Sequence, residues 1–320
     1  MIRNALLLLC CALCARSGAA QILSPAAEKY LDDALDLMQR HSINRDNIDW
    51  PQLRQQVKSR AFQVSSIPET YTLIQAALRG LDDNHSGFTA ASALAARTQR
   101  QAAELKEPVP APPVLPAGVG YLRIPHFSSG NDSLARQYVA QLHAQIRRQD
   151  GPALRGWVVD LRGNTGGNMW PMLIGAGPVL GEGVAGYFDD LHGRATEWGY
   201  RAGQAYIGEQ PPMQLAPELR CQRPGLPVAV LTDERTASSG EALAVAFRGR
   251  PRTRSFGIGT YGVSTSNQSF RLADGARLNL TTAVMADRSC RPYGHSVTPD
   301  EVVDDSEVLA QAVRWIQAQP

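Results

Sequence analysis

The stretch from Trp157 to Asn168 reads WVVDLRGNTGGN and decides the fold of this chain. Its first five residues are apolar except for Asp160, which is typical of a strand buried on both faces. The glycine-rich loop that follows allows a tight turn and exposes backbone N–H groups, which can hold an anion or a developing oxyanion. Spacing alone favours a simpler interpretation, a tight connection from a strand to a helix.

Strands and helices alternate on both sides of this stretch, which indicates an α/β fold. With 43% hydrophobic residues, the 320-residue chain can form a substantial core. We predict strands at residues 119–124 and 228–231, helices at 134–146, 241–247 and 308–316, and a hairpin across 270–284 that turns at Asp274-Gly275. The last helix is expected to be capped near Asp305 or Ser306.

The chain before this core has a different character. From Ser24 to about Leu81 apolar residues recur every three or four positions, which predicts helices, and an alanine-rich stretch to about Leu105 predicts another. Residues 106–116 read KEPVPAPPVLP, and five prolines in eleven residues are typical of a stiff extended linker. We therefore predict an N-terminal helical region at 21–105, a proline-rich linker at 106–116 and a core at 117–320.

Residues 1–20 have the composition of a secretory signal peptide. Arg3 gives a positive start, an eleven-residue apolar run spans Ala5–Ala15, and Gly18-Ala19-Ala20 offers small residues for cleavage. The run is too short to span a bilayer, which takes about 20 residues. We expect an exported protein, periplasmic or secreted, that matures near Gln21 and has no stable membrane insertion.

The cysteines are informative in the same way. Three of the five lie in the signal peptide, where Leu13 before Cys14 disfavours lipoprotein processing. Cys221 and Cys290 remain, either as one disulfide or as two separate thiols. In the mature chain, no Cys-x-x-Cys pair or His/Cys cluster indicates a metal site, and no cofactor is implied.

The charged residues exclude one class of partner and limit the chemistry. The net charge of +2 falls to zero without Arg3 and Arg16, because 30 basic and 30 acidic residues remain. Nucleic-acid binding, which normally needs a basic surplus, is therefore not expected. Three of the basic residues are lysines, and all lie at or before the start of the linker: Lys29, Lys58 and Lys106.

A second strand end carries a candidate nucleophile. Residues 236–241, TASSGE, lie between the strand at 228–231 and a helix, and Ser238 with Glu241 fits a capping box. The same place suits catalysis, because a helix N-terminus favours developing negative charge. The backbone N–H of Ser239 would then point towards an oxyanion on a substrate bound to Ser238. By residue type alone, the cap and the nucleophile are equally good interpretations.

A serine nucleophile needs a base, and no lysine follows Ser238, so histidine is the natural choice. His41 and His143 fall in helical segments, where we expect solvent-facing side chains. His85 lies in a polar loop, LDDNHSGF, after a helix, and is a candidate base. The chain has no G-x-S-x-G motif, which argues against an α/β-hydrolase.

Taken together, these motifs resemble the tail-specific, or C-terminal processing, serine peptidase family. The resemblance extends through almost the whole mature chain, in the family's order. The matching segments are 81–86 (LDDNHS, for D-x-H-S/T), 118–124 (GVGYLRI, for G-Y-I-R-I), 160–167 (DLRGNTGG, for D-L-R-x-N-x-G-G), 236–241 (TASSGE, for T-A-S-A-x-E), 257–262 (GIGTYG, for G-x-x-T-x-G) and 297–300 (VTPD, for G-I-x-P-D).

The resemblance implies that the core has the spiral ββα fold of Clp protease and crotonase. Well-known bacterial members place a catalytic lysine where this chain has Val263, and many insert a peptide-binding PDZ domain that does not fit the short stretch before Tyr121. The tricorn-like branch uses a histidine base supported by a serine and a glutamate, which suits His85. The position of that glutamate holds Tyr293 here.

We therefore expect an exported serine endopeptidase of the tricorn-like branch, without a PDZ domain, that acts on a protein or peptide substrate. The resemblance makes Ser238 the nucleophile and His85 the base, and N–H groups of Gly166 or Gly167 and of Ser239 would hold the oxyanion. The helical region and the linker are expected to form one wall of the substrate groove.

Three alternatives stay open. His295, beside the final Pro-Asp motif, is a reserve base. Retinoid-binding proteins of the vertebrate eye resemble the same family, so Val263 and Tyr293 also fit a non-catalytic ligand- or peptide-binding protein. In the third alternative, Ser238 only caps its helix. The sequence leaves the oligomeric state open.

Overall fold

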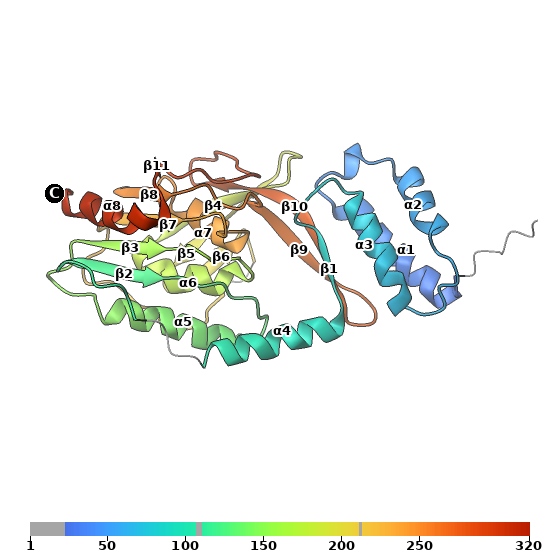
Figure 1. Cartoon of the computed structure of the whole chain (residues 1–320), viewed down its shortest axis with the longest axis horizontal. Coiled ribbons are helices and arrows are strands. Elements are labelled where there is room, and N and C mark those ends of the chain that lie inside the picture. The colour runs from blue at the N-terminus through green and yellow to red at the C-terminus, as the bar shows by residue number, and fades with distance from the viewer. Residues whose placement is uncertain (1–22, 107–110, 211–212) are drawn as a thin grey trace, which may run out of the picture.

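The glycine-rich loop follows strand β3 (Gly156–Asp160), which lies inside a five-stranded parallel sheet (Figure 1). The structure, a computed structural model, describes residues 23–106, 111–210 and 213–320. The predicted signal peptide and residues 107–110 of the predicted linker lie outside this range. The strand order is β11 (Glu301–Val302), β8 (Thr253–Gly257), β7 (Val228–Thr232), β3 and β2 (Val119–Arg123).

Helices cover both faces of this sheet, which explains the unbroken apolar run in β3. Trp157 and Val159 pack against α5 (Asp132–Arg147), α6 (Met169–Leu180) and α7 (Ser239–Phe247), whereas Val158 packs against α8 (Asp305–Gln317). The N-cap of α8 is Asp304, whose side chain makes no capping bond, so the expected cap at Asp305 or Ser306 is wrong by one or two residues.

One expectation for α5 is also wrong. His143 is only 1% exposed rather than solvent-facing, and its Nε2 lies 3.3 Å from the carbonyl oxygen of Ile174 on α6. His143 therefore faces the neighbouring helix α6 and lies beside the predicted apolar stripe of α5.

A second, antiparallel sheet packs on the other side of the largest hydrophobic cluster. Its strands are β1 (Gly87–Thr89), β10 (Arg277–Asp287), β4 (Gly183–Asp189), β5 (Ala195–Arg201) and β6 (Gln204–Ile207) in this order, with β9 (Thr265–Arg271) also paired to β10. The predicted hairpin is confirmed as β9–β10, and it is longer than expected. Strands β1, β4, β5 and β6 were not predicted.

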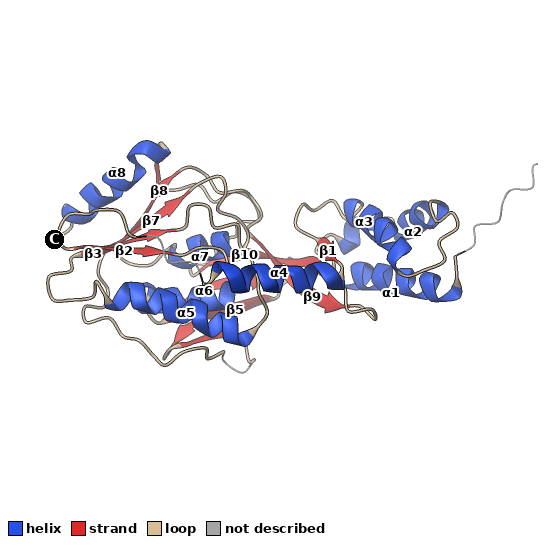
Figure 2. Cartoon of the chain, turned by 60° about the horizontal axis from the view of Figure 1, so that its bottom comes forward, coloured by secondary structure: helices blue, strands red, loops and turns tan. Residues whose placement is uncertain are grey.

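The predicted N-terminal helices are α1 (Pro25–His41), α2 (Trp50–Ser59) and α3 (Tyr71–Arg79), with short 3₁₀ turns at Arg45–Asn47 and Pro68–Thr70. They form one end of an elongated molecule (Figures 1 and 2). Their apolar residues share a cluster with hairpin residues Leu272, Ala276, Leu278 and Leu280. The tip of the β9–β10 hairpin is thus part of this helical lobe.

Helix α4 (Ala91–Glu104), also predicted, leads from the hairpin towards α5 (Figures 1 and 2). Residues 111–116, after it, form no helix or strand. Within the described residues, no helix is both long enough and apolar enough to span a bilayer. Cys221 and Cys290 are both free thiols, so the disulfide alternative is not realised.

Candidate active site

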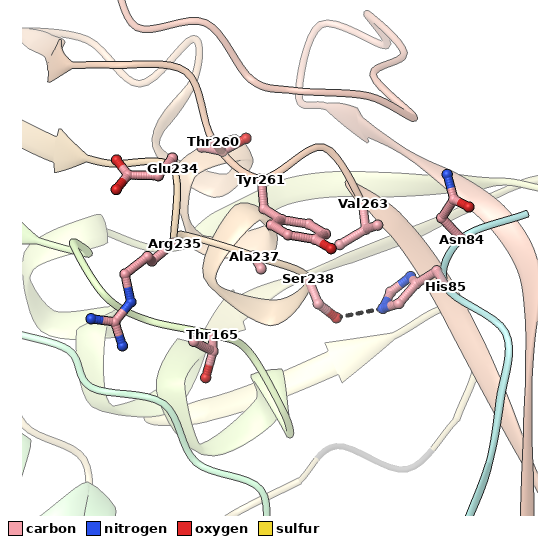
Figure 3. A pocket seen from close by; sticks show the side chains of 10 residues that line it. All are labelled: Asn84, His85, Thr165, Glu234, Arg235, Ala237, Ser238, Thr260, Tyr261 and Val263. Atoms are coloured by element: carbon pink, nitrogen blue, oxygen red, sulfur yellow. Dashed lines mark hydrogen bonds between the residues drawn. The ribbon is translucent and has the colours of Figure 1, made fainter.

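Ser238 occupies the turn between β7 and α7 in an unusual backbone conformation, with φ +52° and ψ −111°. A residue with a side chain rarely adopts this region, and such strain tends to be kept at functional positions. Its Oγ lies 2.9 Å from His85 Nε2 (Figure 3). The hydroxyl is therefore directed at a histidine from a distant part of the chain.

Glu241 fixes the backbone on which Ser238 stands. Its side chain is fully buried, and Oε2 accepts hydrogen bonds from the N–H groups of Ser238 at 2.8 Å and Val263 at 3.0 Å. Oε1 accepts from the Thr260 hydroxyl at 2.6 Å and the Gly262 N–H at 2.9 Å. Burial raises the pKa of Glu241, and these hydrogen bonds oppose the rise. The predicted capping role of Glu241 thus extends to the loop at 260–263.

The loop that carries His85 is held by the aspartate of its own motif. Asp83 Oδ1 accepts the backbone N–H groups of His85 at 3.0 Å and Ser86 at 2.5 Å, and the Ser86 hydroxyl donates to Oδ2. From β9, the Asn267 amide donates to the His85 carbonyl oxygen at 2.9 Å. The motif Asp-x-His-Ser is therefore a compact turn that presents the imidazole.

Both ring nitrogens of His85 have partners. Nε2 faces Ser238, and Nδ1 lies 2.7 Å from Oγ1 of Thr265, the first residue of β9. Burial lowers the pKa of His85, opposed by the charge of Asp83. The neutral form, the one that can accept a proton, is therefore favoured near neutral pH.

The glycine-rich loop packs directly against Ser238. A Cβ on Gly166 would lie 2.8 Å from the Ser238 Cβ and 2.7 Å from the Ala237 carbonyl oxygen, so only glycine fits there. The Gly166 N–H donates to Asn164 Oδ1 at 2.9 Å. The N–H groups of Gly167 and Ser239, in contrast, have no hydrogen-bond partner among the described residues. Of the expected oxyanion donors, these two are the ones still available.

Asp160 and Arg162 anchor that loop from below. Asp160 is fully buried, and its carboxylate receives two hydrogen bonds from the Arg162 guanidinium, at 3.0 and 2.7 Å, and one from Tyr121 at 2.6 Å. Burial acts to raise the pKa of Asp160, but these bonds and the charges of the arginines outweigh it, so the pKa is lowered. Asp233, in turn, accepts the Gly163 N–H and links the loop to the Ser238 turn.

An open pocket of about 810 Å³ lies over the Ser238–His85 pair (Figure 3). It is lined by Asn84, His85, Thr165, Glu234, Arg235, Ala237, Ser238, Thr260, Tyr261 and Val263. The helical region contributes Asn84 and His85 from the loop between α3 and β1, and none of the described linker residues lines the pocket.

The other candidates lie elsewhere or cannot act as bases. Val263 lines the pocket but carries no titratable group. His295 is exposed and is absent from the described pocket lining. Tyr293, at the position of the family's glutamate, donates its hydroxyl to Asp287 at 2.9 Å and not to His85. Thr265 was missed by sequence reasoning; its place two residues after Val263 was the available signal.

Comparisons with known proteins point to one family of peptidases. The model of peptidase family S41 matches residues 118–303, more than half of the chain. A nisin-resistance protein of Lactococcus lactis subsp. lactis is 26% identical over 299 residues, which cover 93% of this chain and 89% of that protein. The chloroplastic carboxyl-terminal-processing peptidase 2 of Arabidopsis thaliana is 27% identical over 165 residues, which cover 52% of this chain and 28% of that protein.

Solved structures show the same similarity in three dimensions. A lipoprotein from Streptococcus agalactiae has a TM-score of 0.77 and 25% identity, covering 93% of this chain and 99% of that one. The photosystem II D1 C-terminal processing protease has a TM-score of 0.54 and 18% identity, covering 91% and 97%. At 18% identity, the similarity to the processing protease concerns the fold alone.

Proposed function

The chain belongs to peptidase family S41, and we propose that it is an exported serine endopeptidase with Ser238 as nucleophile and His85 as general base. The single observation that carries this proposal is the 2.9 Å distance between Ser238 Oγ and His85 Nε2. It is supported by the strained backbone of Ser238, by the pocket above the pair, and by the two unpaired N–H groups beside it.

In the first half of the reaction, Ser238 Oγ attacks the carbonyl carbon of a peptide bond while its proton passes to His85 Nε2. The carbonyl oxygen becomes an oxyanion, held by the N–H groups of Gly167 and Ser239. Each such donor contributes about 3–4 kcal/mol to lowering the barrier. When the intermediate collapses, the carbon–nitrogen bond breaks and His85 gives its proton to the leaving amine.

In the second half, water hydrolyses the acyl-enzyme. His85 Nε2 takes a proton from the water as its oxygen attacks the ester carbon, and the same oxyanion site holds the negative charge. Collapse of this intermediate breaks the bond to Ser238 Oγ, and His85 returns the proton to that oxygen. A carboxylic acid leaves and the enzyme is restored.

Residues 1–20 support export, and the family supports a protein or peptide substrate. The relative in Lactococcus lactis is named for nisin resistance, which makes nisin a substrate worth testing beside an unstructured protein such as casein. Val263 and Tyr293, at two family catalytic positions, favour a second candidate function, a peptide-binding protein without hydrolytic activity.

A serine-directed phosphonate probe separates these functions. The mature chain should be labelled, Ser238→Ala should abolish labelling, and His85→Ala should slow it by about 100-fold or more. His295→Ala is the matched histidine control and should label normally. A folded wild-type chain that neither labels nor cleaves casein or nisin would overturn the peptidase proposal. If Ser238→Ala costs about 1 kcal/mol of stability and changes nothing else, Ser238 only caps its helix.

A further inference from the structure

We infer that Thr265 is the positioning residue of this site, and that its hydroxyl fixes the orientation and the proton of His85. The inference rests on the proposed peptidase function and adds a third residue to it. The observation is the 2.7 Å distance between Thr265 Oγ1 and His85 Nδ1, on the opposite side of the ring from Ser238.

The position of the ring proton decides whether His85 or Thr265 donates the hydrogen bond between them. A neutral imidazole carries one N–H, either on Nδ1 or on Nε2. To receive the Ser238 proton, Nε2 must be unprotonated, so the ring proton has to be on Nδ1. Nδ1–H then donates to Thr265 Oγ1, which is within hydrogen-bond reach. Without an acceptor there, the proton is free to move to Nε2, where it blocks the base.

No other described residue is placed to take this role. Val263 has no polar side-chain atom, and Tyr293 is hydrogen-bonded to Asp287. Asn267, also on β9, uses its amide nitrogen on the His85 carbonyl oxygen rather than on the ring. Thr265 is therefore the residue that contacts Nδ1 of the imidazole.

Thr265 is held on a rigid element. It begins β9 and pairs with Val284 of β10, and its backbone N–H donates to the Val263 carbonyl oxygen at 2.7 Å. The hydroxyl acceptor therefore has a fixed position relative to the strand, and it limits rotation of the imidazole about its side-chain bonds. The Thr265 hydroxyl thus orients the imidazole of His85, a role that a carboxylate has in other serine peptidases.

A hydroxyl orients the ring but brings no negative charge. The charged group that acts on His85 is Asp83, on its own loop, whereas Glu241 on α7 is taken up by the Ser238 turn and the 260–263 loop. Of the β9 residues, the neutral Thr265 contacts the ring, and the neutral Asn267 bonds to the His85 carbonyl oxygen. Thr265→Asp would place a carboxylate against Nδ1 and should move the acid limb of the pH–rate profile upwards.

The kinetic test compares substitutions of similar size. Thr265→Val keeps the shape and removes the acceptor, so kcat should fall by about 100-fold with KM little changed. Thr265→Ser keeps the hydroxyl and should stay within a few-fold of the wild type. Ser266→Ala, the next residue on β9, is the control and should behave as wild type. Thr265→Ala gives a second hydroxyl-free variant, and thermal unfolding identifies any variant that fails to fold.

A second readout does not depend on activity. In ¹⁵N-labelled protein, with the His85 signals assigned from His85→Gln, the wild type should carry its ring proton on Nδ1, and Thr265→Val should show both tautomers. The inference is overturned if the wild type carries the proton on Nε2, or if folded Thr265→Val and Thr265→Ala match the wild type in both readouts. If the tautomer responds but the wild type cleaves nothing, the peptidase proposal fails and the positioning role stands.

Discussion

The carboxylate of Glu241 accepts the backbone N–H of Ser238 at 2.8 Å and so holds the residue whose side chain faces His85. The same carboxylate bonds to Thr260, Gly262 and Val263 in the loop that leads into β9. One buried side chain therefore connects the turn that carries Ser238 to the loop that leads into the strand of Thr265.

Replacing Glu241 with glutamine should be severe, although the shapes are alike. Each carboxylate oxygen accepts two hydrogen bonds, and in either orientation the glutamine NH₂ group would face at least one backbone N–H, which cannot accept a hydrogen bond. We expect a loss of about 2–4 kcal/mol in the free energy of unfolding, together with loss of probe labelling. Denaturant unfolding measures this free energy.

The control is Glu234→Gln, at the exposed pocket rim, which should change the free energy of unfolding by less than about 0.5 kcal/mol. Equal losses of stability in Glu234→Gln and Glu241→Gln would contradict the role of the buried carboxylate.

Gly166→Ala should remove activity, and Gly181→Ala provides a matched control. Both glycines have a φ of +90°, so an alanine is strained at each. At Gly166 the new Cβ would meet Ser238 and Ala237 within 2.8 Å, whereas at Gly181 it meets nothing within 4 Å. Melting should show a stability cost in both variants, larger in Gly166→Ala because of the clash, and labelling should be lost only in Gly166→Ala. Normal labelling of a folded Gly166→Ala would contradict the close packing of the loop.

The acid limb of the pH dependence of kcat/KM should have its midpoint below 6.5, the ordinary pKa of histidine. Burial lowers the pKa of His85, so the ring stays neutral, and active as a base, to lower pH than a free histidine does. The limb should vanish from the residual activity of His85→Ala. A midpoint at or above 6.5 in the wild type would contradict the burial argument.

The same shift affects stability with a defined sign. Because the folded pKa of His85 lies below the unfolded one, the unfolded chain binds the proton more readily as pH falls below about 6.5. The contribution of His85 is therefore complete above that pH and is lost as pH falls towards the folded pKa. Urea unfolding of the wild type and His85→Gln at several pH values should show a smaller acid-side loss in the variant.

The hairpin tip should contribute to stability through two tyrosines. Tyr30 donates to Asp274 Oδ1 at 2.7 Å and Tyr71 donates to Oδ2. Tyr30→Phe should therefore cost about 1–2 kcal/mol. In a double-mutant cycle, Asp274→Asn should cost clearly less once both tyrosines are phenylalanine. Additive effects of the three substitutions in denaturant unfolding would show that the hydrogen bonds do not act together.

The motifs made the Ser238–His85 pair predictable, because each stands in a short segment of recognisable composition. Thr265 was not predictable in this way. Its contact with His85 joins residues 180 positions apart and depends on how β9 pairs with β10. A threonine at the start of a strand is ordinary by composition, and only the tertiary structure gives it a neighbour.

Burial explains the other differences between expectation and structure. His143 looked like a solvent-facing helix residue, but α6 covers it, and α6 was not anticipated as a partner. Strand β5, in the second sheet, has buried residues only at Trp198–Tyr200, so it lacks a long apolar run. Gly166 looked like a free oxyanion donor, but Asn164, two residues before it, takes its N–H. A sequence motif does not show that a nearby side chain has already accepted a backbone N–H group.

The separation of 153 residues between His85 and Ser238 has a consequence for the life of the chain. A contact of this kind needs the intervening chain to be closed into a loop, and this closure has an entropy cost. A nascent or partly unfolded chain has both side chains but not their juxtaposition, so under the proposed function it is latent. Hydrolytic activity would begin only when the hairpin has docked on the helical lobe and the two halves of the chain have met.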